Sequence, residues 1–295
     1  MSMAKLWHRL FVVVFLVLSV LVIKNTYQKS VDQEQDKKDV SEGTLKKAEQ
    51  RKNGIMVLCY HRIVKDNLSN NIIRKLTNNS QIQEYAIDVN TFQNQLDYLK
   101  KRGVRFISMQ QMLEMVKKGR PLKHQYAVLT FDDFDQTVHD NGLPILKAYK
   151  IPCTVFTVTG ITGSYHSGTK LVSWSQIKHM ANNRLITVGL HTNNLHYLLH
   201  NQSAVITADK YNEFKQDYRE SQKLMVHYLG KEAAFFAYPY GSETPRVQRY
   251  LDNRNVTTFS LNIGLINEQT DITHSLPRTM IDKRTWHNVV VPWVK

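Results

Sequence analysis

Short apolar runs alternate along this chain with longer stretches in which apolar side chains recur every three or four positions. The runs have the length and the β-branched or aromatic content of buried strands. They cover residues 55–60, 104–107, 126–131, 153–158, 185–190 and 233–237. Because helix-length stretches separate most of them, the pattern predicts an α/β domain with a mostly parallel sheet.

Capping residues mark the ends of the intervening helices. Asp88 can cap a helix that Gly103 ends, and Ser108 can cap a second helix that stops at Gly119. Further helices are expected near 141–149, from 173 onward and over 208–229. In parallel α/β folds ligands bind at the C-terminal ends of the strands, so the polar residues that follow each apolar run are the candidates for a site.

The N-terminal segment has a different character from the rest of the chain. Two basic residues precede an apolar run of 14 residues from Leu10 to Ile23, and Lys24 follows it. This pattern is typical of a secretory signal, and the run is short for a full membrane span of about 20 residues. We expect residues 1–28 to be a signal peptide or membrane anchor, residues 29–54 a polar tether, and residues 55–295 one exported, folded domain.

Composition and charge narrow the classes of partner. The 295 residues are 42% apolar, enough for one large core, and carry a formal net charge of +14. No helix-turn-helix, zinc-finger or RNA-binding aromatic motif accompanies this charge, so we expect an anionic cell envelope or membrane surface as partner and no nucleic acid. Cys59 and Cys153 both lie in apolar runs and are expected to be buried free thiols.

Two adjacent carboxylates, Asp132 and Asp133, end the apolar run 126–131. Burying two like charges side by side is unfavourable without a cation, and neighbouring strand residues point to opposite faces. One aspartate could therefore bind a metal while the other handles a proton. An acidic turn after the strand is the alternative interpretation.

A second polar cluster favours the metal interpretation. His191 and His196 follow the run 185–190, and their spacing of five predicts a strand end and loop, not a zinc-binding helix. Two histidines and a carboxylate suit a divalent transition metal with positions left open for water and substrate. A third cluster, Tyr238-Pro-Tyr240-Gly241, can hold a backbone N–H toward a developing oxyanion and place aromatic rings against a sugar.

Together these motifs resemble the polysaccharide deacetylases of carbohydrate esterase family four. The resemblance rests on Thr130-Phe-Asp-Asp133, the His191 and His196 pair, and Tyr238-Pro-Tyr-Gly241, and it covers most of residues 55–282. Tyr60-His61 near the domain start and Ser173-Trp174 ahead of the histidines are similar to the poly-β-1,6-N-acetyl-D-glucosamine N-deacetylase branch, of the intercellular adhesion protein B type. The resemblance implies an incomplete, circularly rearranged (β/α) barrel.

The resemblance also implies a role for each candidate residue. Asp133, His191 and His196 would hold a divalent metal, with zinc as the default and cobalt or nickel compatible. Asp132 would be the general base, His61 the general acid, and the Tyr240 backbone N–H an oxyanion donor. Trp174, Tyr238 and Tyr240 would contact the substrate.

Departures from the family pattern lie beside the motifs. Phe134 and Asp135 follow the aspartate pair, where the family usually has a glycine first; we expect the bulky Phe134 to reshape the cleft entrance and Asp135 to be solvated. Ala237 stands where the family commonly has an arginine that orients the base. Arg278 could replace that arginine, or form a surface ion pair. Eight further histidines have no metal-like spacing with the aspartates, and solvated or core positions are expected for them: His124, His139, His166, His179, His200, His227, His274 and His287.

Three functions fit this sequence. The first is metal-dependent N-deacetylation of an extracellular β-1,6-linked N-acetylglucosamine polymer by a monomer, which helps retain the polymer at the cell surface. The second is the same chemistry on peptidoglycan or chitin-like β-1,4 glycans, and the third is a non-catalytic glycan-binding envelope protein. The complete set of ligands, base and acid favours an enzyme.

Overall fold

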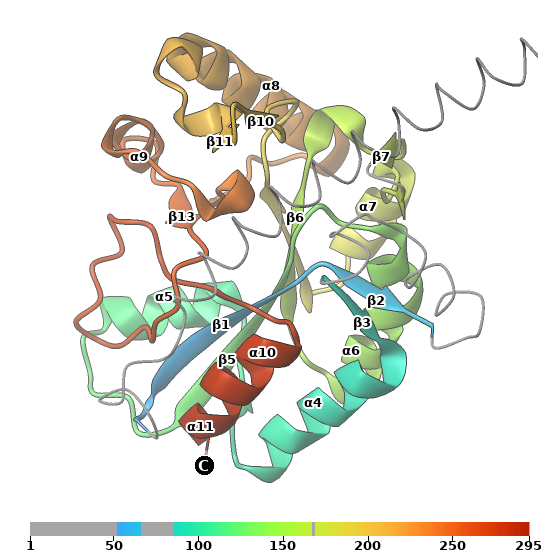
Figure 1. The fold of residues 1–295 in the computed structure, drawn as a ribbon, viewed down its shortest axis with the longest axis vertical. Helices are drawn as coiled ribbons and strands as arrows, with labels where there is room; N and C mark the ends of the chain where they lie inside the picture. Colours follow the sequence, from blue (N-terminus) through green and yellow to red (C-terminus); the bar gives the residue numbers. More distant parts are fainter. Residues whose placement is uncertain (1–51, 66–84, 167–168, 295) are drawn as a thin grey trace, which may run out of the picture.

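A curled, parallel sheet organises the domain and is surrounded by helices (Figure 1). The computed structural model describes residues 52–65, 85–166 and 169–294. The main path of the sheet runs in the order β13-β12-β9-β6-β5-β1-β14, and β4 pairs with β5 outside that path. Its strands are β1 (Gly54–Tyr60), β4 (Arg105–Phe106), β5 (Gln125–Phe131), β6 (Cys153–Thr157), β9 (Ile186–Leu190), β12 (Phe235–Ala237), β13 (Thr257–Phe259) and β14 (Thr279–Met280).

Every ladder in this sheet is parallel, as the alternation of strands and helices predicts. The two ends of the path approach each other at one point, where Phe259 forms a parallel bridge with Leu276, just before β14. The amide of Leu276 donates to Thr258 (2.8 Å), and its carbonyl accepts from Ser260 (3.0 Å). Among the described residues, the edge strands β13 and β14 do not pair with each other, and only this one bridge joins the two edges of the sheet. The predicted incomplete (β/α) barrel is thus confirmed.

The helices lie where the caps predict them. Asp88 accepts from the Thr91 amide at the start of α4, and Ser108 and Ser173 form capping boxes at the starts of α5 and α7. The helices are α4 (Val89–Lys101), α5 (Met109–Lys117), α6 (Leu143–Tyr149), α7 (Trp174–Ala181), α8 (Tyr211–Leu229), α9 (Pro245–Asp252), α10 (Lys283–Thr285) and α11 (Val291–Val294). Short strand pairs flank them: β2 (Arg62–Val64) with β3 (Ala86–Asp88), β7 (Tyr165–His166) with β8 (Thr169–Lys170), and β10 (Leu198–Leu199) with β11 (Gln202–Ser203).

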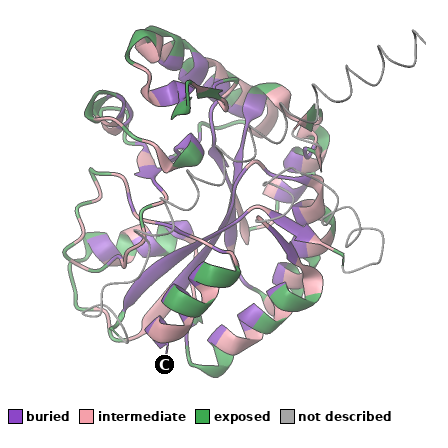
Figure 2. Ribbon diagram, in the orientation of Figure 1, coloured by how far each residue is buried: buried purple, intermediate pink, exposed green. Residues whose placement is uncertain are grey.

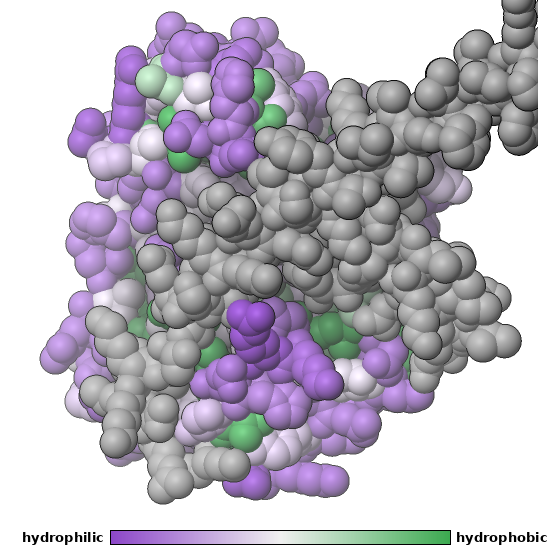
Figure 3. Space-filling model, viewed as in Figure 1, coloured by the Kyte–Doolittle hydropathy of each residue, from purple (hydrophilic) through white to green (hydrophobic). Residues whose placement is uncertain are grey.

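The core occupies both faces of the sheet. All seven residues of β1 are buried, and alternate residues belong to two apolar clusters: Leu58 to one with α4, and Val57 to one with α5. Burial is concentrated in the strands and exposure on the outer sides of the helices (Figure 2). The described surface in Figure 3 is mostly hydrophilic. Cys59 and Cys153 are buried free thiols, as predicted.

The predicted N-terminal signal or anchor and most of the predicted tether lie outside the described residues. Within the part of the chain that is described, no helix is both long and apolar enough to cross a membrane.

Close strand packing gives a prediction at Gly189 in β9. A Cβ atom there would lie 2.7 Å from two ring atoms of Phe156 and 3.1 Å from the Phe235 carbonyl oxygen. We expect Gly189→Ala to lower the free energy of unfolding by about 1–3 kcal/mol, because both neighbours are buried and must shift. Urea unfolding measures this change. Thr187→Ser in the same strand is the control, expected within about 0.5 kcal/mol of the parent; an equal effect of both variants would contradict the prediction.

Candidate active site

The register of the sheet brings the candidate residues to one edge. Tyr60 of β1 pairs with Phe131 of β5, so His61 and Asp132 leave adjacent strands at the same level. Leu190 of β9 pairs with Phe236 of β12, which places His191 beside the segment that leads to Tyr238. The site is therefore assembled at the C-terminal ends of the strands, as expected for this class of fold.

Three donor atoms converge at the centre of this edge. The Nε2 atoms of His191 and His196 lie 3.1 Å apart, and Asp133 Oδ1 lies 3.7 Å from the first and 3.2 Å from the second. Ligands of a tetrahedral zinc ion with bonds of 2.0–2.1 Å are about 3.3 Å apart. These donors thus already have the spacing that a small divalent metal requires.

The proton of His191 is located by its other ring nitrogen. Nδ1 lies 2.8 Å from the Ala237 carbonyl oxygen, which can only accept, so Nδ1 carries the hydrogen and Nε2 presents a lone pair. Burial lowers the pKa of His191 to about 4, more than the neighbouring aspartates raise it. The ring is therefore neutral at pH 7, the state that a metal ligand needs.

Asp133 completes the donor set. Burial alone would raise its pKa, but His196 and His191 more than offset this and hold the pKa below its ordinary value. Its Oδ1 atom is buried and has no hydrogen-bond partner among the described residues. An orphaned carboxylate oxygen facing two imidazole lone pairs fits a bound cation, and we conclude that the residues present fit the metal that the sequence predicts.

Asp132 faces a different cation. Arg278 is fully buried and donates through both terminal nitrogens to the two Asp132 oxygens, at 2.6 and 2.8 Å. Burial would raise the pKa of Asp132, but this guanidinium holds it well below its usual range. The surface ion pair considered for Arg278 is wrong: the residue orients the carboxylate, as the missing motif arginine would. Asp132 Oδ2 also lies 3.9 Å from His191 Nε2, beside the metal donors.

His61 follows strand β1 and lies close to Asp132. A ring nitrogen of His61 and a carboxylate oxygen of Asp132 lie within 4.8 Å of each other. The imidazole stacks on Tyr85, with ring centroids 5.1 Å apart. Burial lowers the pKa of His61, and the charges of Asp132 and Asp133 partly oppose that shift.

The aromatic candidates have different positions. The Tyr240 ring is 37% exposed and lies 5.0 Å from His196 between centroids, on a backbone with φ of 59°. Tyr238 is completely buried and its hydroxyl donates to Gln248, so its predicted contact with sugar is wrong for this conformation. Trp174 is half-buried and stacks on Tyr228 of α8, with centroids 4.5 Å apart.

The two expectations for the residues after Asp133 are wrong. Phe134 adopts φ of 57° and packs in the core, so it does not line the cleft entrance. Asp135 is buried, accepts from the Thr137 amide at 2.7 Å and from the Thr169 hydroxyl, and lies 3.6 Å from Arg62 Nε. This cluster ties the segment after His61 to the segment after the aspartate pair.

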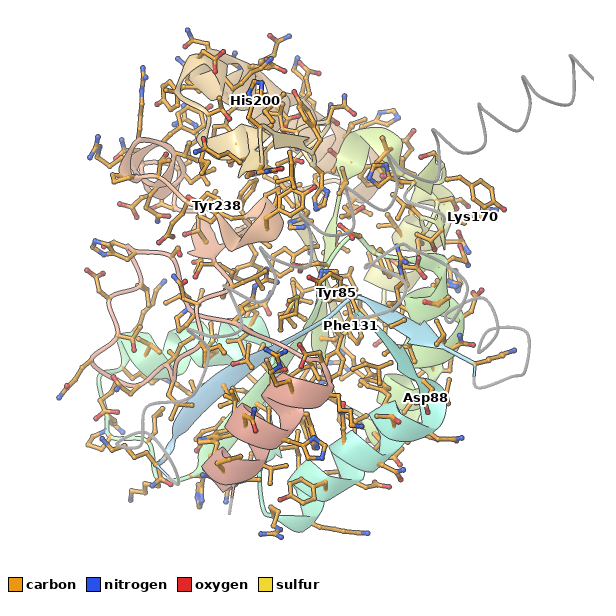
Figure 4. The ribbon with its side chains drawn as sticks, in the orientation of Figure 1. Tyr85, Asp88, Phe131, Lys170, His200 and Tyr238 are labelled. Atoms are coloured by element: carbon orange, nitrogen blue, oxygen red, sulfur yellow. The ribbon has the colours of Figure 1, made fainter. Side chains whose placement is uncertain are left out.

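One histidine near the site was not predicted. His166 of β7 has its ring centroid 6.4 Å from that of His196, and no sequence spacing indicates this because His196 lies in a separate segment, after β9. The histidines expected to be solvated include His200, which lies at the periphery in Figure 4, whereas Tyr85 and Phe131 lie near the middle. The exposed ones are His179, His200, His227, His274 and His287.

Comparisons with known proteins agree with this geometry. A family model described as polysaccharide deacetylase matches residues 119–259. Poly-beta-1,6-N-acetyl-D-glucosamine N-deacetylase from Staphylococcus aureus (strain NCTC 8325 / PS 47) is 28% identical over 259 residues, which cover 84% of this chain and 86% of that protein. The protein of the same name from Staphylococcus epidermidis is 27% identical over 251 residues, with the same shares of 84% and 86%.

Solved structures have the same fold. IcaB from Ammonifex degensii has a TM-score of 0.74 and 29% identity, covering 85% of this chain and 99% of that one. A de-N-acetylase from Aggregatibacter actinomycetemcomitans has a TM-score of 0.65 and 25% identity, covering 78% of this chain and 95% of that one. These likenesses confirm the predicted type of incomplete (β/α) barrel.

Proposed function

We propose that this chain, which contains a polysaccharide deacetylase domain, removes N-acetyl groups from an extracellular β-1,6-linked N-acetylglucosamine polymer. The observation that carries the proposal is the convergence of Asp133, His191 and His196 beside an aspartate held by a buried arginine. The printed names of the staphylococcal relatives support the choice of polymer.

Different site residues carry out different steps of the proposed reaction. A bound divalent metal, zinc by default, would polarise the acetamide carbonyl and lower the pKa of the attacking water from about 15.7 toward 7. Asp132 takes a proton from that water, since the Arg278 guanidinium keeps the carboxylate ionised at neutral pH. Cobalt and nickel suit the same nitrogen and oxygen donors.

Two further groups act on the acetamide. The Tyr240 backbone N–H donates to the oxygen on which negative charge develops. His61 acts in its protonated form, which the charges of Asp132 and Asp133 favour against burial, and gives its proton to the nitrogen as the C–N bond breaks, because an amide nitrogen leaves poorly unless it is protonated. The products are acetate and a free amine on the polymer. The Tyr240 ring, exposed next to His196, provides a surface for the sugar.

The product explains the biological role that we propose. Free amines on the polymer become cationic and are attracted to an anionic cell surface. The polymer is then retained at the envelope and supports biofilm formation. The basic, exported domain, expected to act as a monomer near that surface and to bind no nucleic acid, suits this location.

Acetate release tests the proposal. The full-length protein is stripped with chelator, reloaded with zinc or cobalt, and assayed on β-1,6 and β-1,4 N-acetylglucosamine oligomers in parallel. We expect metal-dependent release from the β-1,6 series. Preference for β-1,4 oligomers would select peptidoglycan or chitin-like glycans instead. Binding of glycan without acetate release from either series would contradict the enzymatic function for these substrates.

A further inference from the structure

The loop from His191 to His196 carries two of the three metal donors and needs a rigid support. Its first residue is fixed by strand β9, by the His191 amide bonded to Thr157 (2.9 Å), and by Nδ1 bonded to Ala237. Thr192 then adopts φ of 74°, and the chain leaves the sheet. The position of His196 therefore depends on what holds residues 193 and 194.

A buried carboxylate holds both of those residues. Asp217 of α8 is 7% exposed; its Oδ1 accepts from the Asn193 amide at 2.7 Å and its Oδ2 accepts from the Asn194 amide at 2.6 Å. Hydrogen bonds of this length to a carboxylate are among the stronger ones in proteins. Both oxygens of one side chain thus bind consecutive amides in the middle of the loop.

The segment that follows β6 also holds the loop. The Thr159 amide donates to the Thr192 carbonyl and the Gly160 amide to the Asn193 carbonyl, each at 3.0 Å. The Thr159 hydroxyl donates to Asn193 Oδ1 at 2.9 Å and lies 3.1 Å from Ser221 Oγ, one turn beyond Asp217 on α8. The loop backbone is held between one strand end and one helix face.

Burial of the charged Asp217 side chain is unfavourable. Burial raises its pKa to about 6, although the hydrogen bonds from Asn193 and Asn194 act in the opposite direction. Because the pKa is higher in the native state than in the unfolded chain, the ionised carboxylate makes the native state less stable at neutral pH. The two amide hydrogen bonds are the interactions that hold this carboxylate at the loop.

We propose that Asp217 is a positioning residue that sets the distance between the His196 and His191 donor atoms by binding the Asn193 and Asn194 amides. The inference rests on the proposed function, since it concerns the same metal site. Without the two amide bonds the centre of the loop is free to shift, and the 3.1 Å spacing of the Nε2 atoms is no longer imposed. Asp217 is not one of the three candidate donors and acts through the loop backbone.

Zinc affinity of the full-length protein tests this role. Asp217→Asn has the same shape, but its NH2 group cannot accept from the second amide. We expect zinc binding about 10- to 100-fold weaker than in the parent, measured by competition with a chromophoric chelator. The visible absorption of the cobalt-loaded protein should also change, because it reports ligand geometry. With saturating metal, kcat should fall more than KM changes.

Two further variants keep the test decisive. Glu220→Gln is the matched control, because it removes an exposed carboxylate from the same helix, where it pairs with Lys223; the zinc affinity of this variant should equal that of the parent. Asp217→Glu keeps the charge on a longer side chain and replaces Asp217→Asn in the test if that variant fails to fold. An intermediate loss of zinc affinity is expected for Asp217→Glu. Parent-like zinc affinity and cobalt spectrum in a folded Asp217 variant would overturn the inference. Failure of the parent itself to bind zinc would instead count against the proposed function.

Discussion

Replacing Asp132 with asparagine is expected to lower kcat for acetate release by about 100- to 10,000-fold while the protein still binds its metal. The carboxylate lies beside the three donor atoms, 3.9 Å from His191 Nε2, but both of its oxygens are bound by Arg278. Asparagine keeps the size of the side chain and cannot take a proton from water. Initial rates on the β-1,6 oligomers and metal content of the same preparations measure the two effects.

Asp140→Asn is the matched control for this variant. Asp140 lies in the helical segment Val138–Gly142 beyond β5; its carboxylate is 54% exposed and pairs with His139, so the Asp140→Asn protein should release acetate at the parent rate. An Asp132→Asn protein with a normal rate would assign the base to another group. Loss of metal together with activity would place Asp132 among the ligands.

Replacing Arg278 with methionine should have the largest effect on stability. The variant leaves the Asp132 carboxylate buried without its cation, and breaking one partner of a buried ion pair typically costs about 3–5 kcal/mol. Urea unfolding of metal-free protein at pH 7 measures this loss without a contribution from bound metal. Arg278→Lys keeps the charge but cannot bind both oxygens with a planar fork, so an intermediate loss is expected.

The Arg278 prediction has a definite dependence on pH. The native pKa of Asp132 lies below its ordinary value of about 4, so the pair stabilises the parent above that pH and loses its effect as the pH falls toward the native pKa. In Arg278→Met, burial is left to raise the pKa of Asp132. The difference in unfolding free energy between parent and variant should therefore be largest at neutral pH. It should shrink as the pH falls through the raised pKa of Asp132 in the variant, and further below about pH 4, where the parent loses the effect of its pair. A difference independent of pH would show that lost packing, not lost charge pairing, is responsible.

The sequence predicts well whatever depends on local pattern. Apolar runs of strand length end in Asp132, Asp133 and His191, and parallel pairing brings strand ends to one edge, so the donor set follows from periodicity and topology. The caps at Asp88 and Ser108 are likewise local, because each side chain binds an amide three residues later.

Contacts between distant parts of the chain could not be predicted in this way. Arg278 is separated from Asp132 by 146 positions, and only the packing of β14 against β1 decides between a buried pair and a surface pair. Asp135 looks solvated in sequence because its partners Arg62 and Thr169 lie in strands β2 and β8, far from it along the chain. Tyr238 looks available for sugar because an aromatic residue after a strand can point either way, and here it points into the core.

The near-closure of the sheet between Phe259 and Leu276 has a consequence for the order in which the enzyme is completed during synthesis. All three candidate metal donors, the base and the acid are present once the chain has been made as far as His196. The guanidinium that binds the Asp132 base belongs to Arg278, which is made later and lies on the segment that joins the two edges of the sheet. A nascent chain that has not yet docked β14 against β1 therefore carries the metal donors but leaves Asp132 without its guanidinium, so the last strand to be made is the one that completes the base.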